Sequence, residues 1–225
     1  MRIVKDFVTH GDLSKFGGYL VHTTGDGIPK GFIDSKKKDL LSYAVGVYEK
    51  MGDVGPHYII SPDGEVAQVR NETKIAWHAG VSGYEREMFL TGNWETDGRT
   101  AKEVVKWWKR KHAGVKSPSH LYPAKSPNQD FIGVEMIPAG TYTKNDWEPT
   151  LSEGAQLFGR FTIHQYMSLA LLSLSANPTR IVGHEDVNPI TRPGWDPGDK
   201  TGSWNWNQFF ELRNAILKQK VWGAL

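Results

Sequence analysis

Short apolar runs that alternate with helical patterns constrain the fold of this chain more than any other feature. Three of them, at Tyr19–Val21, 130–138 ("DFIGVEMIP") and 180–184 ("RIVGH"), are expected to be buried strands. Residues 57–70 are expected to form two strands around the turn Pro62-Asp63-Gly64. Strands separated by helices favour layered folds with a buried sheet. We therefore predict an α/β fold in which a central, mostly buried mixed β-sheet is flanked by helices.

Three segments carry helical spacing of apolar residues. Residues 34–52 ("DSKKKDLLSYAVGVYEKMG") end on Gly52, a common stop signal. Residues 162–176 open with a capping box from Thr162 to Gln165 and precede an Asn-Pro stop. Residues 206–219 form a terminal pattern with one apolar face. These segments are the expected helices around the sheet.

The pattern loosens between residues 82 and 130, and we predict an insertion there. Inside it, residues 100–114 ("TAKEVVKWWKRKHAG") have the capping box and glycine stop of one short helix. Five of its residues are basic and one is acidic. These cations form either a solvated face or, together with Trp107, a surface that approaches an anionic polymer.

Composition sets limits on the class of protein. With 225 residues, 39% of them hydrophobic, the chain can bury a core as a single domain. The 27 basic and 25 acidic residues are too balanced to indicate a nucleic-acid partner. No apolar run approaches the length of a membrane span, and the first residues lack a signal-peptide core. We expect a soluble monomer with no nucleic-acid partner and no membrane insertion.

Polar residues follow two of the expected strands. His22 and His184 should emerge at an edge of the sheet, and Asp196 follows in a loop stiffened by proline. Two imidazoles and a carboxylate are a ligand set of catalytic zinc, which lowers the pKa of bound water to about 7. Cysteine is absent, so thiolate zinc sites are excluded. Any one of these residues alone indicates little, because a single histidine after a strand is more often a loop residue than a ligand.

Glu135 is the one charge within an otherwise apolar strand. Burial of a carboxylate is unfavourable unless it has a polar role, and partial burial would raise its pKa towards that of a useful general base. A structural carboxylate held in a salt bridge is the alternative.

Four sequence blocks resemble the signature blocks of the zinc-dependent N-acetylmuramoyl-L-alanine amidases. This group, the type 2 amidases, includes the phage T7 lysozyme type, the bacterial recycling amidases and the peptidoglycan recognition proteins. The blocks are "YLVHTT", "GPHYIISPDGEVAQVRNETKIAWHAG", "FIGVEMI" and "RIVGHEDVNPITRPGWDPG". The resemblance implies the architecture of that group in one catalytic domain, residues 1–225, with an insertion at about 82–130 and no separate cell-wall-binding domain.

The resemblance also implies roles for the matched residues. Those that match the ligands of one catalytic Zn²⁺ are His22, His184 and Asp196. Glu135 matches the glutamate that activates the zinc-bound water.

Three residues of the second block are expected to support the ligands or contact substrate. They are His57, Trp77 and His78. For His57, a core histidine with satisfied hydrogen bonds is the alternative.

Two positions depart from the family pattern. Pro56 stands where some phage members have a tyrosine, so the base cannot come from there. Gly194 stands where many relatives have a lysine thought to stabilise the oxyanion. Arg192 is the nearest cation that could take over that catalytic role.

The implied reaction is zinc-dependent hydrolysis of the amide bond between N-acetylmuramic acid and L-alanine of peptidoglycan. A phage-type lysin is the expected setting, and a cytoplasmic amidase that recycles muropeptides is the first alternative. A non-catalytic recognition module and a zinc amide hydrolase with a different substrate are the others. Because the sequence lacks a signal peptide, we expect a cytoplasmic enzyme that reaches the cell wall through a pore.

Overall fold

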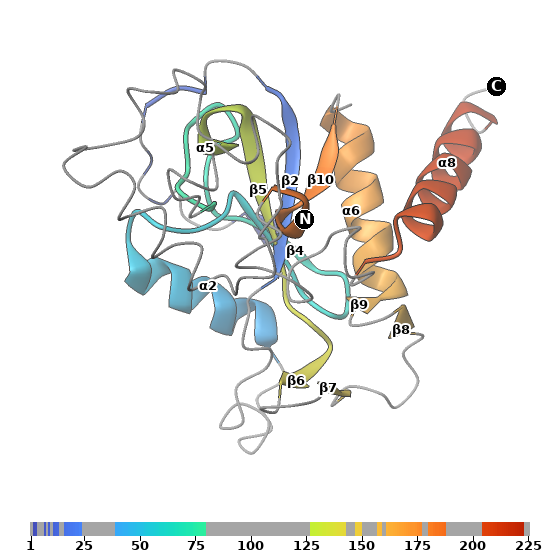
Figure 1. Cartoon of the computed structure of the whole chain (residues 1–225), viewed down its shortest axis with the longest axis horizontal. Coiled ribbons are helices and arrows are strands. Elements are labelled where there is room, and N and C mark those ends of the chain that lie inside the picture. Colours follow the sequence, from blue (N-terminus) through green and yellow to red (C-terminus); the bar gives the residue numbers. More distant parts are fainter. Residues whose placement is uncertain are drawn as a thin grey trace, which may run out of the picture.

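A six-stranded mixed sheet forms the centre of the protein (Figure 1). The structure is a computed structural model that describes residues 2–3, 7, 9, 11–13, 16–23, 39–79, 127–142, 147–149, 157–158, 161–176, 180–187 and 204–222. In sheet order the strands are β1 (Arg2–Ile3), β4 (Val66–Gln68), β3 (Tyr58–Ile60), β5 (Phe131–Met136), β2 (Gly18–Thr23) and β10 (Ile181–Gly183). Only the β3–β4 pair among them is antiparallel. The predicted mixed sheet is confirmed.

Helices cover both faces of this sheet, as expected. Helix α2 (Leu40–Met51) packs on one face, and α6 (Ile163–Ala176) lies on the other with α8 (Trp206–Trp222) packed against it (Figure 1). Two short helices, α5 (Pro127–Asp130) and α7 (His184–Val187), adjoin β5 and β10. Two small hairpins stand apart from the main sheet: β6 (Gly140–Tyr142) with β7 (Trp147–Pro149), and β8 (Leu157–Phe158) with β9 (Phe161–Thr162).

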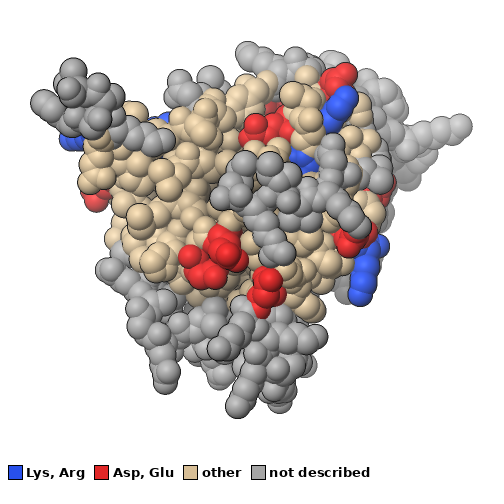
Figure 2. Space-filling view, turned by 180° about the vertical axis from the view of Figure 1, so that it is seen from behind, with Lys and Arg blue, Asp and Glu red and all other residues tan. Residues whose placement is uncertain are grey.

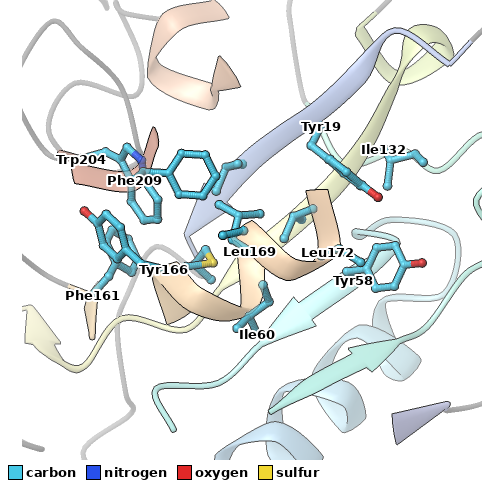
Figure 3. Packing of buried hydrophobic residues seen from close by; sticks show 14 residues of the cluster. Tyr19, Tyr58, Ile60, Ile132, Phe161, Tyr166, Leu169, Leu172, Trp204 and Phe209 are labelled. Atoms are coloured by element: carbon cyan, nitrogen blue, oxygen red, sulfur yellow. The ribbon is translucent and has the colours of Figure 1, made fainter. Parts of the chain in front are cut away.

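The larger hydrophobic core lies between the sheet and α6 with α8 (Figure 3). It takes alternate residues of the strands, such as Tyr19 and Val21 of β2, because successive side chains of a strand point to opposite faces. Aromatic rings make up part of this core, where Tyr166 stacks on Trp204 with 4.1 Å between the ring centroids. A second core joins the opposite face of the sheet to α2. The sheet is therefore buried on both faces.

Local signals that the sequence predicts are confirmed. Helix α2 ends at Gly52, whose φ of +71° suits glycine. At the start of α6 the backbone N–H of Thr162 donates to Oε1 of Gln165, and the N–H of Gln165 donates to Oγ1 of Thr162. This is the reciprocal capping box. The turn between β3 and β4 places Gly64 at a φ of +86°.

Part of the sequence prediction falls on residues that the structure does not describe. The expected helix at 100–114 lies outside the described residues, and of the expected insertion at 82–130 only 127–130 are described, as α5. Within the described part of the chain, no helix is long and apolar enough to cross a membrane. On the face seen in Figure 2, the described acidic side chains form small groups, some of which lie beside Lys or Arg side chains.

Candidate functional site

His22 and Glu135 lie side by side on one face of the sheet. Strands β2 and β5 are parallel, and their register makes His22 and Glu135 Cα partners. Because side chains alternate along a strand, both point away from the larger core, which takes Val21 and Val134 from the neighbouring positions. Both are buried, with 3% of His22 and 6% of Glu135 exposed. The sheet thus places an imidazole and a carboxylate together near the carboxyl ends of its parallel strands.

His184 lies beside His22 at the first residue of α7, directly after the neighbouring strand β10. Strand β10 ends at Gly183, the Cα partner of Val21, so His184 follows at the level of His22. The Nδ1 atoms of the two rings are 2.9 Å apart, and His184 is also buried. The fold therefore brings together two of the predicted ligands, which are separated by 162 positions in the sequence.

His78 contacts the other side of the His22 ring. Its Nδ1 lies 2.9 Å from Nε2 of His22, and its own Nε2 lies 3.0 Å from the carbonyl oxygen of Phe131. A carbonyl oxygen only accepts hydrogen bonds, so Nε2 of His78 carries a proton. Burial, the main cause, lowers the pKa of His78 well below its usual value, and the ring is neutral.

Two residues that the sequence analysis did not single out hold His78 in place. The side chain of Asn128 accepts hydrogen bonds from the backbone N–H groups of His78 and Ala79, at 3.1 and 2.7 Å, and donates to the carbonyl of Ala79 at 3.0 Å. Below the ring lies Gly133 of β5, where a Cβ atom would stand only 2.4 Å from Cγ of His78. A glycine inside a strand often marks such a close approach, so the run "FIGVEM" carried a signal for it.

We expect Gly133→Ala to lower the free energy of unfolding by about 1–3 kcal/mol, the usual effect of overpacking. The added methyl group would force the His78 ring, and with it the contact to His22, to shift. Urea unfolding followed by circular dichroism measures the change. Gly46→Ala is the matched control, because a Cβ at Gly46 meets nothing within 4 Å and α2 should gain stability. Equal stability of Gly133→Ala and the unaltered protein would contradict this account.

His57 is fully buried and uses both ring nitrogens on the main chain. Its Nδ1 accepts a hydrogen bond from the backbone N–H of Gly133, and its Nε2 donates to the carbonyl of Lys74. Burial lowers the pKa of His57 to about 4, the hydrogen bond to Lys74 raises it in part, and the positive charge of Arg70 lowers it further. His57 is therefore neutral at pH 7 and links β5 to the segment that carries His78.

Arg70 is the largest fully buried side chain among the described residues. Its guanidinium donates hydrogen bonds to the carbonyls of Pro56 at 2.7 Å and Gly52 at 2.9 Å, and it lies 5.4 Å from the centre of the Phe7 ring. The sequence analysis did not identify it, because an arginine after a strand is ordinarily exposed. Arg70 fixes the turn that leads into His57.

Glu72 anchors the start of the same segment to the sheet. One of its carboxylate oxygens accepts hydrogen bonds from the hydroxyls of Tyr58, at 2.7 Å, and Tyr19, at 3.3 Å. Burial and the neighbouring carboxylate raise the pKa of both tyrosines, which stay protonated as donors. Trp77 lies further along this segment with 52% of its surface exposed, and its backbone carbonyl accepts a hydrogen bond from Gly55.

The paired histidines fit two of the ligand positions of a zinc ion. A tetrahedral zinc with Zn–N distances of about 2.0–2.1 Å separates two nitrogen ligands by about 3.3 Å, so a small shift of the rings would admit it. Both rings turn the same atom, Nδ1, towards the shared position. The third predicted ligand, Asp196, and the predicted cation Arg192 lie outside the described residues. Within those residues, no group of three or more histidine, cysteine or acidic side chains is arranged to hold a metal.

One family model and several solved structures are similar to this chain. The family model described as N-acetylmuramoyl-L-alanine amidase matches residues 17–199. A selenomethionine derivative of AmpD is 20% identical, with 94% of this chain and 93% of that chain covered and a TM-score of 0.46. The catalytic domain of XlyA is 15% identical, with coverage of 95% and 99% and a TM-score of 0.47. The amidase LysC from Clostridium intestinale URNW is 16% identical, with coverage of 97% and 98% and a TM-score of 0.42. No curated protein gives a significant match.

Proposed function

The chain belongs to the N-acetylmuramoyl-L-alanine amidase family and has that amidase activity, and we propose that it cleaves peptidoglycan with one zinc ion and Glu135. The bond cut is the amide between the lactyl group of N-acetylmuramic acid and L-alanine of the stem peptide. The observation that supports zinc most directly is the 2.9 Å approach of Nδ1 of His22 to Nδ1 of His184. Asp196 would supply the third ligand. Zinc held there would act as a Lewis acid and lower the pKa of water to about 7.

Glu135 acts as the general base and then as the general acid. Its carboxylate takes a proton from the attacking water, whose oxygen bonds to the lactyl carbonyl carbon. The carboxyl group then returns this proton to the L-alanine nitrogen as the carbon–nitrogen bond breaks. The position of Glu135 beside His22, buried on the same sheet face, supports this role. Pro56 offers no hydroxyl that could replace it.

Arg192 is proposed to stabilise the negative charge on the carbonyl oxygen, since Gly194 cannot. Arg192→Lys should then retain more turnover than Arg192→Ala. Wild-type turnover of Arg192→Ala would remove this residue from the mechanism.

Trp77, with its exposed indole next to His78, is proposed to stack on a sugar ring of the substrate.

Removal of zinc tests the central proposal. Purified protein with zinc should release stem peptides with new L-alanine amino termini from peptidoglycan, detected by mass spectrometry. Dialysis against a chelator should reduce this release to background, and added zinc should restore it. Release of reducing sugar instead of peptide, or full activity after complete removal of metal, would contradict the proposal.

We further propose that the enzyme works as a phage-type lysin on the intact wall, which it reaches through a pore. The sequence "GHEDVNP", which includes His184, and the expected insertion at 82–130 support this setting. Activity on intact sacculi that exceeds activity on soluble muropeptides is the expected result. The reverse preference would favour the recycling role.

A further inference from the structure

We propose that His78 is a positioning residue for the metal site, because its Nδ1 selects the protonation form of His22 that leaves Nδ1 of His22 free of a proton. This inference rests on the proposed zinc dependence. His78 sets the position of the proton on the His22 ring in the metal-free protein, before zinc binds.

The positions of the protons follow from one end of the hydrogen-bonded chain. The carbonyl oxygen of Phe131 can only accept, so the proton of the neutral His78 ring sits on Nε2. Nδ1 of His78 is then an acceptor, and the partner atom, Nε2 of His22, must donate. In a neutral His22 the remaining nitrogen, Nδ1, then carries no proton and acts as an acceptor. That atom is the one which lies 2.9 Å from Nδ1 of His184.

Hydrogen bonds and close packing hold His78 in place. Asn128 holds its backbone, and Gly133 leaves just enough room for the ring to lie on β5. The accepting carbonyl of Phe131 belongs to the same strand. Since β5 also pairs with β2 in register, one strand positions both His78 and the backbone of His22. A neutral His78 therefore cannot donate from Nδ1 without giving up the proton on Nε2 and with it the hydrogen bond to Phe131.

This arrangement should strengthen metal binding. A histidine ligand whose second nitrogen donates to a fixed acceptor has its ring oriented and its basicity raised, and loss of such a partner typically weakens metal affinity about 10–100-fold. His78→Phe keeps a flat ring but removes the acceptor. His78→Asn places an oxygen acceptor near the position of Nδ1.

The test measures zinc affinity by competition with a chromophoric chelator. We expect His78→Phe to bind zinc about 10–100-fold more weakly than the unaltered protein and His78→Asn to recover most of the affinity. His164→Phe, at an exposed position on α6, is the control for loss of a histidine and should bind zinc normally. Unchanged affinity in His78→Phe would overturn the inference. Failure of the unaltered protein to bind zinc would instead refute the proposed function.

A second measurement does not depend on the variants folding. Nitrogen-15 NMR of the imidazole rings in the metal-free protein should show His22 and His78 protonated at Nε2 and unprotonated at Nδ1. A proton on Nδ1 of His22 in the neutral ring would overturn the inference, whatever the affinities are.

Discussion

Glu135→Gln should lower kcat for peptide release by about 10²–10⁴-fold, the usual contribution of a general acid–base group. Glutamine has nearly the same shape as glutamate but cannot take a proton from water. Because Glu135 lies on a central strand, next to His22 in the sheet register, the substitution changes the chemistry with little change in packing. Zinc content should stay the same, since Glu135 is not among the proposed ligands.

Single-turnover assays on purified peptidoglycan, together with metal analysis, measure this effect. Glu65→Gln is the matched control, because Glu65 is exposed at the β3–β4 turn and should not affect turnover. Turnover of Glu135→Gln within a factor of a few of the unaltered enzyme would exclude Glu135 as the base. Loss of zinc together with activity would indicate a structural role.

Acid should destabilise the metal-free protein as the pH falls below about 6.5, because His57 is buried as a neutral ring. The pKa of His57 is about 4 in the folded protein, against an ordinary value of 6.5 in the unfolded chain. Between these values the unfolded state binds the additional proton, so the free energy of unfolding rises with pH. The contribution of His57 to the free energy of unfolding is fully present above about pH 6.5 and is lost as the pH falls towards 4. This loss of stability amounts to about 3 kcal/mol. The lowered pKa of His78 acts in the same direction.

Urea unfolding of metal-free protein between pH 7.5 and pH 4.5 measures this loss. His57→Gln should be less stable at pH 7 but should show a shallower dependence on pH, since glutamine does not titrate. The slope of the free energy of unfolding against pH, not the absolute stability, is therefore the informative quantity. An identical slope in the variant and the unaltered protein would show that His57 is not the source of the acid sensitivity.

The sequence predicted the parts of the fold that local chemistry determines. Helix α2 with its Gly52 stop, the capping box of Thr162 and Gln165, and the turn at Gly64 each depend on residues a few positions apart. Alternation of these elements was enough to predict the mixed, doubly covered sheet. The strand order was not predictable in the same way, because it depends on contacts between distant segments.

The supports of the site were missed for the same reason. Asn128 and Arg70 act on residues at least 14 positions away in the sequence, and nothing in their immediate neighbours reveals this. Gly133, a glycine inside a strand, carried a signal of close approach but not of its partner, His78. Arg70 in particular contradicts the general expectation that arginine is exposed, since its donors are satisfied by carbonyls inside the fold. The positions of Asp196 and Arg192 stay predictions, since both lie outside the described residues.

The three hydrogen bonds of Asn128 have a consequence for how such a protein can diversify. They join His78 and Ala79 to the start of α5, so Ala79 and Asn128 are held together although they are 49 positions apart in the sequence. The sequence between Ala79 and Asn128 is therefore bounded by these hydrogen bonds, and the entropy lost on closing a loop rises only slowly with its length. Evolution or design could exchange this stretch for a longer, shorter or differently charged one while the catalytic sheet keeps its geometry.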